Sequence, residues 1–265
     1  MPSLRIGLPC IRVEENAFVR NLKSVEEVLE QRSAENIDLF VFGEANLTGL
    51  DRTDFSSRAF PDISHVVQTV NQLTKNFSTA VCVGFIEKEK NKYYLTHLLS
   101  SEGILCGIQR KVFPGNPVKP HIYSSGKEIR PISFREYQII IFACADWMLP
   151  EPMMQAGQYE PDLIIAPTDQ YHWTPHTLSV LRKVGQSVSF WLHAPLIVAF
   201  KSAANPEDEE EEVYACLAYD YRGDELIKKS KKIKENAFYT IDLELQKESR
   251  KWGGFQERKK YLESV

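Results

Sequence analysis

Two spacings of hydrophobic residues alternate along the chain, and each predicts a different kind of element. Over residues 15–32 hydrophobic side chains recur every three to four positions, which predicts a helix with one buried stripe. The run over residues 37–42 is almost entirely hydrophobic, which is typical of a short strand covered on both faces. Both elements therefore need a core to pack against.

The same patterns continue to the end of the chain. Helical stripes cover residues 63–73 and about 176–192. Further strands are predicted at residues 4–8, 79–86, 93–99, 104–109, 137–142, 162–166, 195–200 and 213–219. Turns at 100–103 and 221–224 indicate that 93–99 pairs antiparallel with 104–109 and that 213–219 turns back into a strand over 225–229. This alternation favours a layered fold of strands and helices, and since no linker or repeat divides the chain, we expect one domain over residues 1–265.

Composition supports a folded chain and argues against two kinds of partner. Hydrophobic residues make up 43% of the 265 residues, which is enough for a substantial core. The net charge is −4 and no basic stripe carries interleaved aromatic residues, so we expect no nucleic-acid partner. No hydrophobic run approaches the roughly 18 to 20 residues that span a bilayer, and the first residues are too short and strand-like for a signal peptide. We therefore expect a cytoplasmic protein that does not enter a membrane.

The five cysteines are widely spaced and form no CxxC pair, so reduced thiols are expected. They are Cys10, Cys82, Cys106, Cys144 and Cys216. Most lie in apolar runs, where a free cysteine is usually a small core residue. Cys144 allows a second interpretation because its run ends abruptly in "FACADWMLPEP". It is either core filler or a nucleophile held at the end of a strand.

Two other hydrophobic runs also end in chemically capable residues. Residues 37–42 lead into Glu44, and residues 104–109 lead into Lys111. Sites in layered folds are commonly built at strand ends, because the sheet holds each residue while loops shape the pocket. A carboxylate, an ammonium group and a thiol could therefore meet there.

These three segments resemble the nitrilase superfamily of carbon-nitrogen hydrolases, whose signature is a Glu-Lys-Cys triad in that order. The similarity rests on "DLFVFGEANLTGL", with Gly43 where the family usually has proline, on "GIQRKVFP", and on "CADWMLPE". It extends over nearly all the chain. The resemblance implies an α+β fold, a four-layer αββα sandwich, and a homodimer that pairs through the helix after the cysteine motif and through the C-terminal region.

The chemistry implied by the resemblance is amide hydrolysis. A thiol with a pKa near 8.5 is mostly protonated at neutral pH, so Glu44 would remove the Cys144 proton as general base. Lys111 and the backbone N–H of Ala145 would stabilise the negative oxygen of the tetrahedral intermediate. Attack on a small linear amide would release ammonia or an amine and leave a thioester, which water then hydrolyses. Asp146 would shape the turn after Cys144, and neither a metal nor a cofactor is expected.

Departures from the family pattern bear on the substrate. A second family glutamate is replaced near Lys119, with His121 beside it as a candidate substrate contact. Met148 stands where members acting on carbamoyl amino acids carry an arginine, which makes that substrate class less favoured. Trp147 and Met148 either form an apolar wall or pack beneath the site. Since Ala145 and Asp146 follow the cysteine, instead of the Trp-Glu of nitrile-specific members, an amide is preferred over a nitrile.

One alternative from another functional class stays open. The missing glutamate, together with the loss of polar residues from the later helix over residues 188–192, is also compatible with a degenerate member that binds a ligand without turning it over.

Overall fold

The computed structural model describes residues 3–50, 59–60, 62–114, 123–169, 175–201, 216–227 and 237–244. Its first sheet has the strand order β11-β1-β2-β3-β4-β5. These strands are β1 (Ser3–Cys10), β2 (Leu39–Val41), β3 (Ala80–Glu89), β4 (Lys92–Ser101), β5 (Ile104–Arg110) and β11 (Ala237–Glu244). The strands β1, β2 and β3 run parallel, while β11 and the β3-β4-β5 meander pair antiparallel.

The second sheet has the order β10-β9-β8-β7-β6. Its strands are β6 (Ile132–Phe134), β7 (Tyr137–Ile141), β8 (Leu163–Thr168), β9 (Leu196–Phe200) and β10 (Cys216–Tyr219). The three central strands are parallel, and the outer two pair antiparallel. The carboxyl ends of β7, β8 and β9 therefore open on the same edge of the sheet.

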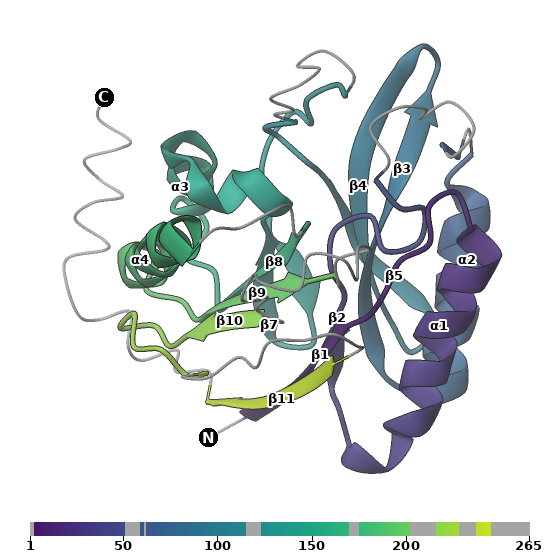
Figure 1. The fold of residues 1–265 in the computed structure, drawn as a ribbon, viewed down its shortest axis with the longest axis horizontal. Helices are drawn as coiled ribbons and strands as arrows, with labels where there is room; N and C mark the ends of the chain where they lie inside the picture. Colours follow the sequence, from purple (N-terminus) through teal and green to yellow (C-terminus); the bar gives the residue numbers. More distant parts are fainter. Residues whose placement is uncertain are drawn as a thin grey trace.

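Two pairs of helices cover the outer faces of the sheets (Figure 1). Helices α1 (Phe18–Gln31) and α2 (Ser64–Phe77) pack on the first sheet, and α3 (Pro150–Ala156) and α4 (Pro175–Leu192) pack on the second. Short 3₁₀ turns follow α1 at Ser33–Glu35 and β7 at Cys144–Met148. The order of layers is helix, sheet, sheet, helix, which is the αββα sandwich expected from the sequence.

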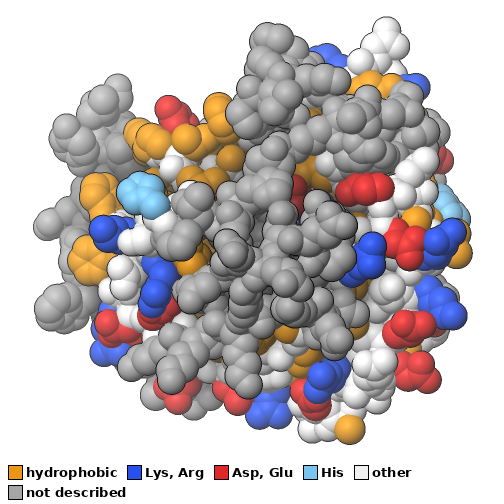
Figure 2. Space-filling view, in the orientation of Figure 1, with side chains coloured by type: hydrophobic (Ala, Val, Ile, Leu, Met, Phe, Trp, Pro, Cys, Tyr) orange, Lys and Arg blue, Asp and Glu red, His pale blue; other side chains and the backbone are white. Residues whose placement is uncertain are grey.

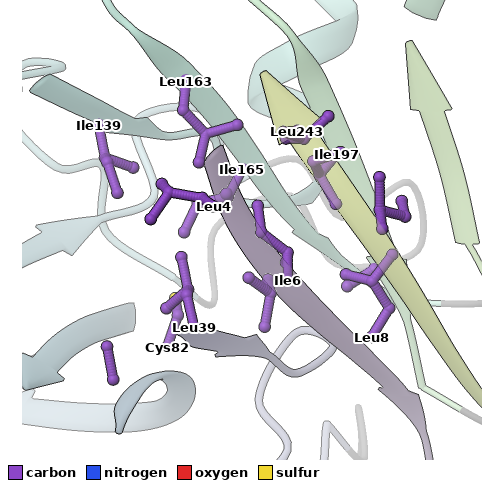
Figure 3. Packing of buried hydrophobic residues seen from close by; sticks show 14 of the residues in the cluster. Leu4, Ile6, Leu8, Leu39, Cys82, Ile139, Leu163, Ile165, Ile197 and Leu243 are labelled. Atoms are coloured by element: carbon purple, nitrogen blue, oxygen red, sulfur yellow. The ribbon is translucent and has the colours of Figure 1, made fainter. Parts of the chain in front are cut away.

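The central core layer joins the two sheets. Leu4 and Ile6 of β1 lie between Leu39 of β2 and Ile165 of β8 (Figure 3). All of these side chains are buried, and each fully buried Leu or Ile contributes about 1.5–3 kcal/mol of hydrophobic stabilisation. Since β1, β2 and β8 contribute to one core, the sheets hold their strand ends in a fixed relation.

Most elements lie where the hydrophobic pattern places them, with differences at their ends. Helix α1 begins at Phe18, not residue 15, because Asn16 has a positive φ of 55° that a helix cannot include. The pattern did not indicate three elements: α3, whose seven residues are too few to show a helical stripe, the three-residue strand β6, and the edge strand β11. After the turn at 221–224, the backbone of Leu226 bonds to Ala218 and Glu225 forms a single bridge with Tyr219. Residues 213–215 and 228–229 of the predicted hairpin lie outside the described residues.

No helix among the described residues is long and apolar enough to cross a membrane. All five cysteines are free, and Cys10, Cys82 and Cys216 are buried in the layer between the sheets.

Candidate active site

The three residues singled out from the sequence lie just beyond three strand ends. Glu44 follows β2, Lys111 follows β5, and Cys144 follows β7. Ala45 and Cys144 both have positive φ, 49° and 47°. That conformation costs energy for any residue with a Cβ and is often retained where it serves a site. Sharp left-handed turns therefore end the glutamate and cysteine segments.

Glu44 and Lys111 form a buried ion pair. Lys111 Nζ lies 2.8 Å from Glu44 Oε1, and the side chains are 4% and 1% exposed. Burial by itself acts to lower the pKa of Lys111, but the neighbouring Cys144 and Glu44 raise it above the ordinary value. The second carboxylate oxygen, Glu44 Oε2, is buried and has no hydrogen-bond partner within the described ranges. The site thus holds a charged lysine and one carboxylate oxygen available to accept a proton.

Backbone contacts hold the lysine at the end of its strand. The N–H of Lys111 donates to the carbonyl of Leu95 at 2.8 Å, and the carbonyl of Lys111 accepts from the N–H of Gly126 at 2.7 Å. A Cβ at Gly126 would lie 2.5 Å from the carbonyl oxygen of Arg110, so only glycine permits this approach.

Cys144 is partly exposed, and its thiol interacts electrostatically with both members of the ion pair. Burial is the largest cause that raises the pKa of Cys144 to about 12, and the negative charge of Glu44 adds to it. Lys111 and a hydrogen bond from the backbone N–H of Asp169 act in the opposite direction. The resting group is therefore a protonated thiol, which needs a base before it can attack a carbonyl.

Asp146 joins the cysteine turn to the lysine strand. Its carboxylate accepts hydrogen bonds from the backbone N–H groups of Val112 (3.0 Å) and Phe113 (2.7 Å), which directly follow Lys111. Burial raises the pKa of Asp146 to about 6, although these two N–H groups favour its charged form. Asp146 is fully buried, so it lies behind the site and fixes Lys111 relative to Cys144.

The other predicted site residues are more spread out. Trp147 is fully buried in the cluster under α4 and donates from Nε1 to Thr168 Oγ1 at 3.2 Å. Met148 packs partly against the same cluster, and Ala145 is half-buried beside Cys144. His121 lies outside the described residues. The packing of Trp147 fits a support beneath the site better than a wall of it.

Gly43 has a steric reason to be glycine. A Cβ at this position would lie 2.4 Å from the backbone nitrogen of Lys201 and 2.9 Å from the carbonyl carbon of Phe200. Real Cβ atoms do not approach backbone this closely, and proline carries a Cβ as well. The departure from the family's proline thus accompanies a close contact between the two sheets.

Sequence reasoning missed a second ion pair at the site. Lys201 Nζ lies 3.0 Å from Asp169 Oδ1, with side chains 11% and 10% exposed. Burial by itself acts to lower the pKa of Lys201, but the charge and hydrogen bond of Asp169, with other carboxylates, raise it above the ordinary value. Asp169 directly follows β8, and Lys201 directly follows β9. The strand-end rule that selected Glu44, Lys111 and Cys144 would have selected these two residues also.

His97 is a further buried polar residue near the site. Neither ring nitrogen has a hydrogen-bond partner in the part of the chain that the structure describes. Burial, and then the charge of Lys111, lower the pKa of His97 to about 3, so the ring is neutral. A Cβ at Gly84 would lie 2.6 Å from His97 Nε2 and 2.8 Å from the nitrogen of Ala45, so the ring lies close to the turn after Glu44.

Nothing in the described ranges groups three or more His, Cys, Asp or Glu side chains in a way that could hold a metal ion. What the arrangement offers is a thiol, an adjacent base, a fixed positive charge and backbone donors. These are the components of nucleophilic acyl transfer.

Comparisons with known proteins agree with the fold. The model of the carbon-nitrogen hydrolase family matches residues 11–250. A search of curated proteins gave no match. Among solved structures, a carbon-nitrogen hydrolase from Helicobacter pylori G27 is 14% identical with a TM-score of 0.82, covering 96% of this chain and 94% of its own.

Two further structures have the same fold. Saccharomyces cerevisiae Nit3, of branch 10 of the nitrilase superfamily, is 17% identical with a TM-score of 0.77, covering 94% of this chain and 93% of that one. A mutant of the amidase from Nesterenkonia sp. AN1 is 14% identical with a TM-score of 0.78, covering 98% of both chains. In that protein, acrylamide has undergone Michael addition at the active-site cysteine.

Proposed function

Because the chain belongs to the carbon-nitrogen hydrolase family, we propose that it hydrolyses a small linear amide through a thioester on Cys144. The observation that carries this proposal is the buried Glu44–Lys111 ion pair, in the electrostatic neighbourhood of the Cys144 thiol, with one carboxylate oxygen that no described residue bonds.

In the first half of the reaction, Glu44 takes the thiol proton as the sulfur attacks the amide carbonyl carbon. The C=O electron pair moves to oxygen, and Lys111 and the backbone N–H of Ala145 stabilise the resulting negative charge. Collapse of the tetrahedral intermediate breaks the C–N bond, and the proton held by Glu44 passes to the departing nitrogen. Ammonia or an amine leaves, and the acyl group remains on sulfur.

In the second half, Glu44 removes a proton from water, which attacks the thioester. The second tetrahedral intermediate expels the Cys144 sulfur, which regains its proton from Glu44, and a carboxylic acid leaves. Because the pKa of Cys144 is raised, the resting thiol keeps its proton. This fits a mechanism in which the Glu44 carboxylate first removes that proton as a base and later returns a proton as an acid.

An amide is favoured over other carbon–nitrogen substrates by residues next to the nucleophile. Asp146 occupies the second position after Cys144, where nitrile-specific members carry glutamate, and it is bonded to the strand of Lys111. Met148 provides no charge to hold a carboxylate. The Nesterenkonia amidase mutant adds support only for a nucleophilic cysteine in this fold, since Michael addition of acrylamide occurs at its C=C bond and not at its amide carbon.

We also propose that the protein is cytoplasmic and that two copies pair through α4. Phe190 and Trp191 near the end of this helix are 56% and 59% exposed, and Val180 is 45% exposed. Hydrophobic side chains are visible over the α3 and α4 side of the molecule (Figure 2). Exposed apolar groups on one face are typical of a subunit contact. A sedimentation coefficient of a monomer at micromolar concentration would contradict the pairing.

The test is intact-protein mass spectrometry after incubation with pooled small amides, carbamoyl compounds and nitriles, with released ammonia measured in parallel. We expect an added acyl mass or ammonia release with amides, and neither with Cys144→Ala. The matched control is Cys106→Ala, which removes a partly exposed thiol of β5 and should behave like the wild type. Ligand binding without turnover, equal in wild type and Cys144→Ala, would instead favour the binding-protein alternative.

A further inference from the structure

The peptide group between Thr168 and Asp169 lies between the proposed base and the proposed nucleophile. Its carbonyl oxygen accepts a hydrogen bond from the backbone N–H of Glu44 at 3.4 Å. Its N–H, contributed by Asp169, donates to the Cys144 sulfur. In a trans peptide the C=O and N–H point in opposite directions, so one rigid unit can contact both segments.

The side chain of Asp169 is held by Lys201. The two residues follow the neighbouring parallel strands β8 and β9, whose last paired residues are Thr168 and Phe200. Their ion pair is 3.0 Å long and only about a tenth exposed. The backbone of Lys201 in turn packs against Gly43, the residue before the base. A chain of contacts thus leads from Gly43 through Lys201 and Asp169 to the sulfur.

We propose that Asp169 and Lys201 are a positioning pair, which holds the Thr168–Asp169 peptide group so that its N–H faces the Cys144 sulfur. The inference rests on the proposed cysteine chemistry and deepens it. The N–H supports negative charge on sulfur when Glu44 removes the thiol proton, and again when the sulfur leaves the acyl group. Lys111 and the Ala145 N–H are left to act on the carbonyl oxygen.

The charged groups around the Cys144 sulfur show how the Asp169–Lys201 pair affects the stability of the thiolate. Glu44 and the Asp169 carboxylate disfavour a thiolate, while Lys111 and the Asp169 N–H favour it. The negative charges of Asp169, Glu15 and Glu44 act on Lys201 and favour its charged form. Loss of Lys201 would therefore free the Asp169 side chain and leave more uncompensated negative charge near Cys144. Both changes reduce the thiolate fraction.

The experiment measures the rate of Cys144 alkylation in the full-length protein, from about pH 7 to pH 10, by peptide mass spectrometry. The variants are Lys201→Met and the neutral double variant Asp169→Asn/Lys201→Met, which leaves no stranded charge and protects the test if the single variant folds poorly. The control is Arg182→Met, which breaks the Arg182–Glu225 ion pair beside α4. Circular dichroism confirms that each protein is folded, and Cys106 serves as an internal reference thiol.

We expect alkylation of Cys144 by iodoacetamide to slow at least about tenfold at every pH in Lys201→Met, because one hydrogen bond to a charged group corresponds to a factor of this order. The double variant should slow by less, but by more than about twofold, because it also removes the Asp169 carboxylate that disfavours the thiolate. The smaller reagent methyl methanethiosulfonate should slow by the same factor, since a change in thiolate fraction affects both reagents equally. The control should stay within about twofold of wild type.

Rates within twofold of wild type in the folded variants would overturn the proposal, and so would a loss seen with only one reagent, which indicates altered access. The reaction with iodoacetamide needs no amide substrate. Failure of the positioning proposal can therefore be told apart from failure of the proposed amidase activity, which is read from ammonia release.

Discussion

Two buried ion pairs lie at the site, and they are assembled in different ways. Glu44 and Lys111 are 67 residues apart, and their strands β2 and β5 are separated in the sheet by β3 and β4. Asp169 and Lys201 follow neighbouring strands, so pairing of β8 with β9 already brings them together. The first pair is also more deeply buried than the second.

The difference indicates what each pair requires of the fold. The desolvation of two buried charges is repaid only with good geometry, and removal of one partner is then more harmful than removal of both. The Glu44–Lys111 pair depends on the correct assembly of the four strands β2 to β5, whereas the Asp169–Lys201 pair depends on one strand pairing. Variants that leave one member of a pair charged and unpaired should therefore lower stability most at the Glu44–Lys111 pair.

Lys111→Met should have the largest effect. It leaves Glu44 charged and unpaired in the interior, which costs about 3–5 kcal/mol of unfolding free energy, measured by denaturant titration. Glu44→Leu/Lys111→Met should regain most of that stability and still release no ammonia. A single variant as stable as the wild type would show that the pair is not buried as described.

Asp146→Asn should have the next largest effect. The carboxylate of Asp146 accepts hydrogen bonds from two N–H groups, whereas the amide of Asn has only one acceptor oxygen. The Val112 or Phe113 N–H then loses its partner, which costs about 2–3 kcal/mol, and Lys111 loses its fixed relation to Cys144. Amide turnover should fall at least about tenfold. Asp162→Asn is the matched control, since Asp162 accepts from the Gln138 N–H away from Lys111; it should lose stability but keep turnover.

Gly43→Ala tests the contact between the first ion pair's segment and the backbone of Lys201. The added Cβ forces the two sheets apart locally, at a cost of about 1–3 kcal/mol. Gly157→Ala is the control, because a Cβ there meets no atom closer than 3.4 Å and Gly157 has a helical φ of −59°. Equal thermal midpoints for the two variants would contradict the close approach at Gly43.

The pH dependence of Cys144 follows from its raised pKa. With a pKa of about 12, the thiolate fraction, and hence the iodoacetamide rate, should rise about tenfold for each pH unit between about pH 7 and pH 10. The same shift means that stability contributed by the neutral thiol is retained below pH 9 and is lost as the pH rises toward 12. An iodoacetamide rate that stops rising below about pH 9 would contradict this pKa. It would show that the ion pair stabilises the thiolate enough to bring the pKa of Cys144 below about 9.

His97→Leu should have the smallest effect. The change removes two buried nitrogens that have no hydrogen-bond partner among the described residues, so unfolding free energy should stay equal or rise by about 1 kcal/mol. The ring is already neutral above about pH 3, so wild type and variant should show the same pH dependence from pH 5 to 8. A large loss of stability would indicate that the ring is bonded.

The hydrophobic pattern was sufficient for the layers and for most strands, because continuous apolar runs and helical stripes directly reflect burial on two faces or one. It could not indicate α3 or β6, whose seven and three residues are too few for a pattern to repeat clearly. The start of α1 depended on the backbone conformation of Asn16, which composition does not encode.

The strand-end rule predicted that Glu44, Lys111 and Cys144 would meet, and it could have included Asp169 and Lys201. The register of β8 and β9 could not be obtained from the sequence, and without it nothing indicates that these two side chains form a pair. The contact of Gly43 with Lys201 likewise joins segments that are far apart in sequence.

The cysteines buried between the sheets give the protein built-in reporters of its own opening. Cys10, Cys82 and Cys216 come from three different strands of both sheets and lie in the central layer. Burial raises the pKa of each of these thiols. A neutral alkylating reagent can reach them only when the sheets separate, whereas Cys144 reacts from the folded state. The ratio of the two labelling rates would then measure, in one sample, how often the sandwich opens relative to how well its reactive centre is formed.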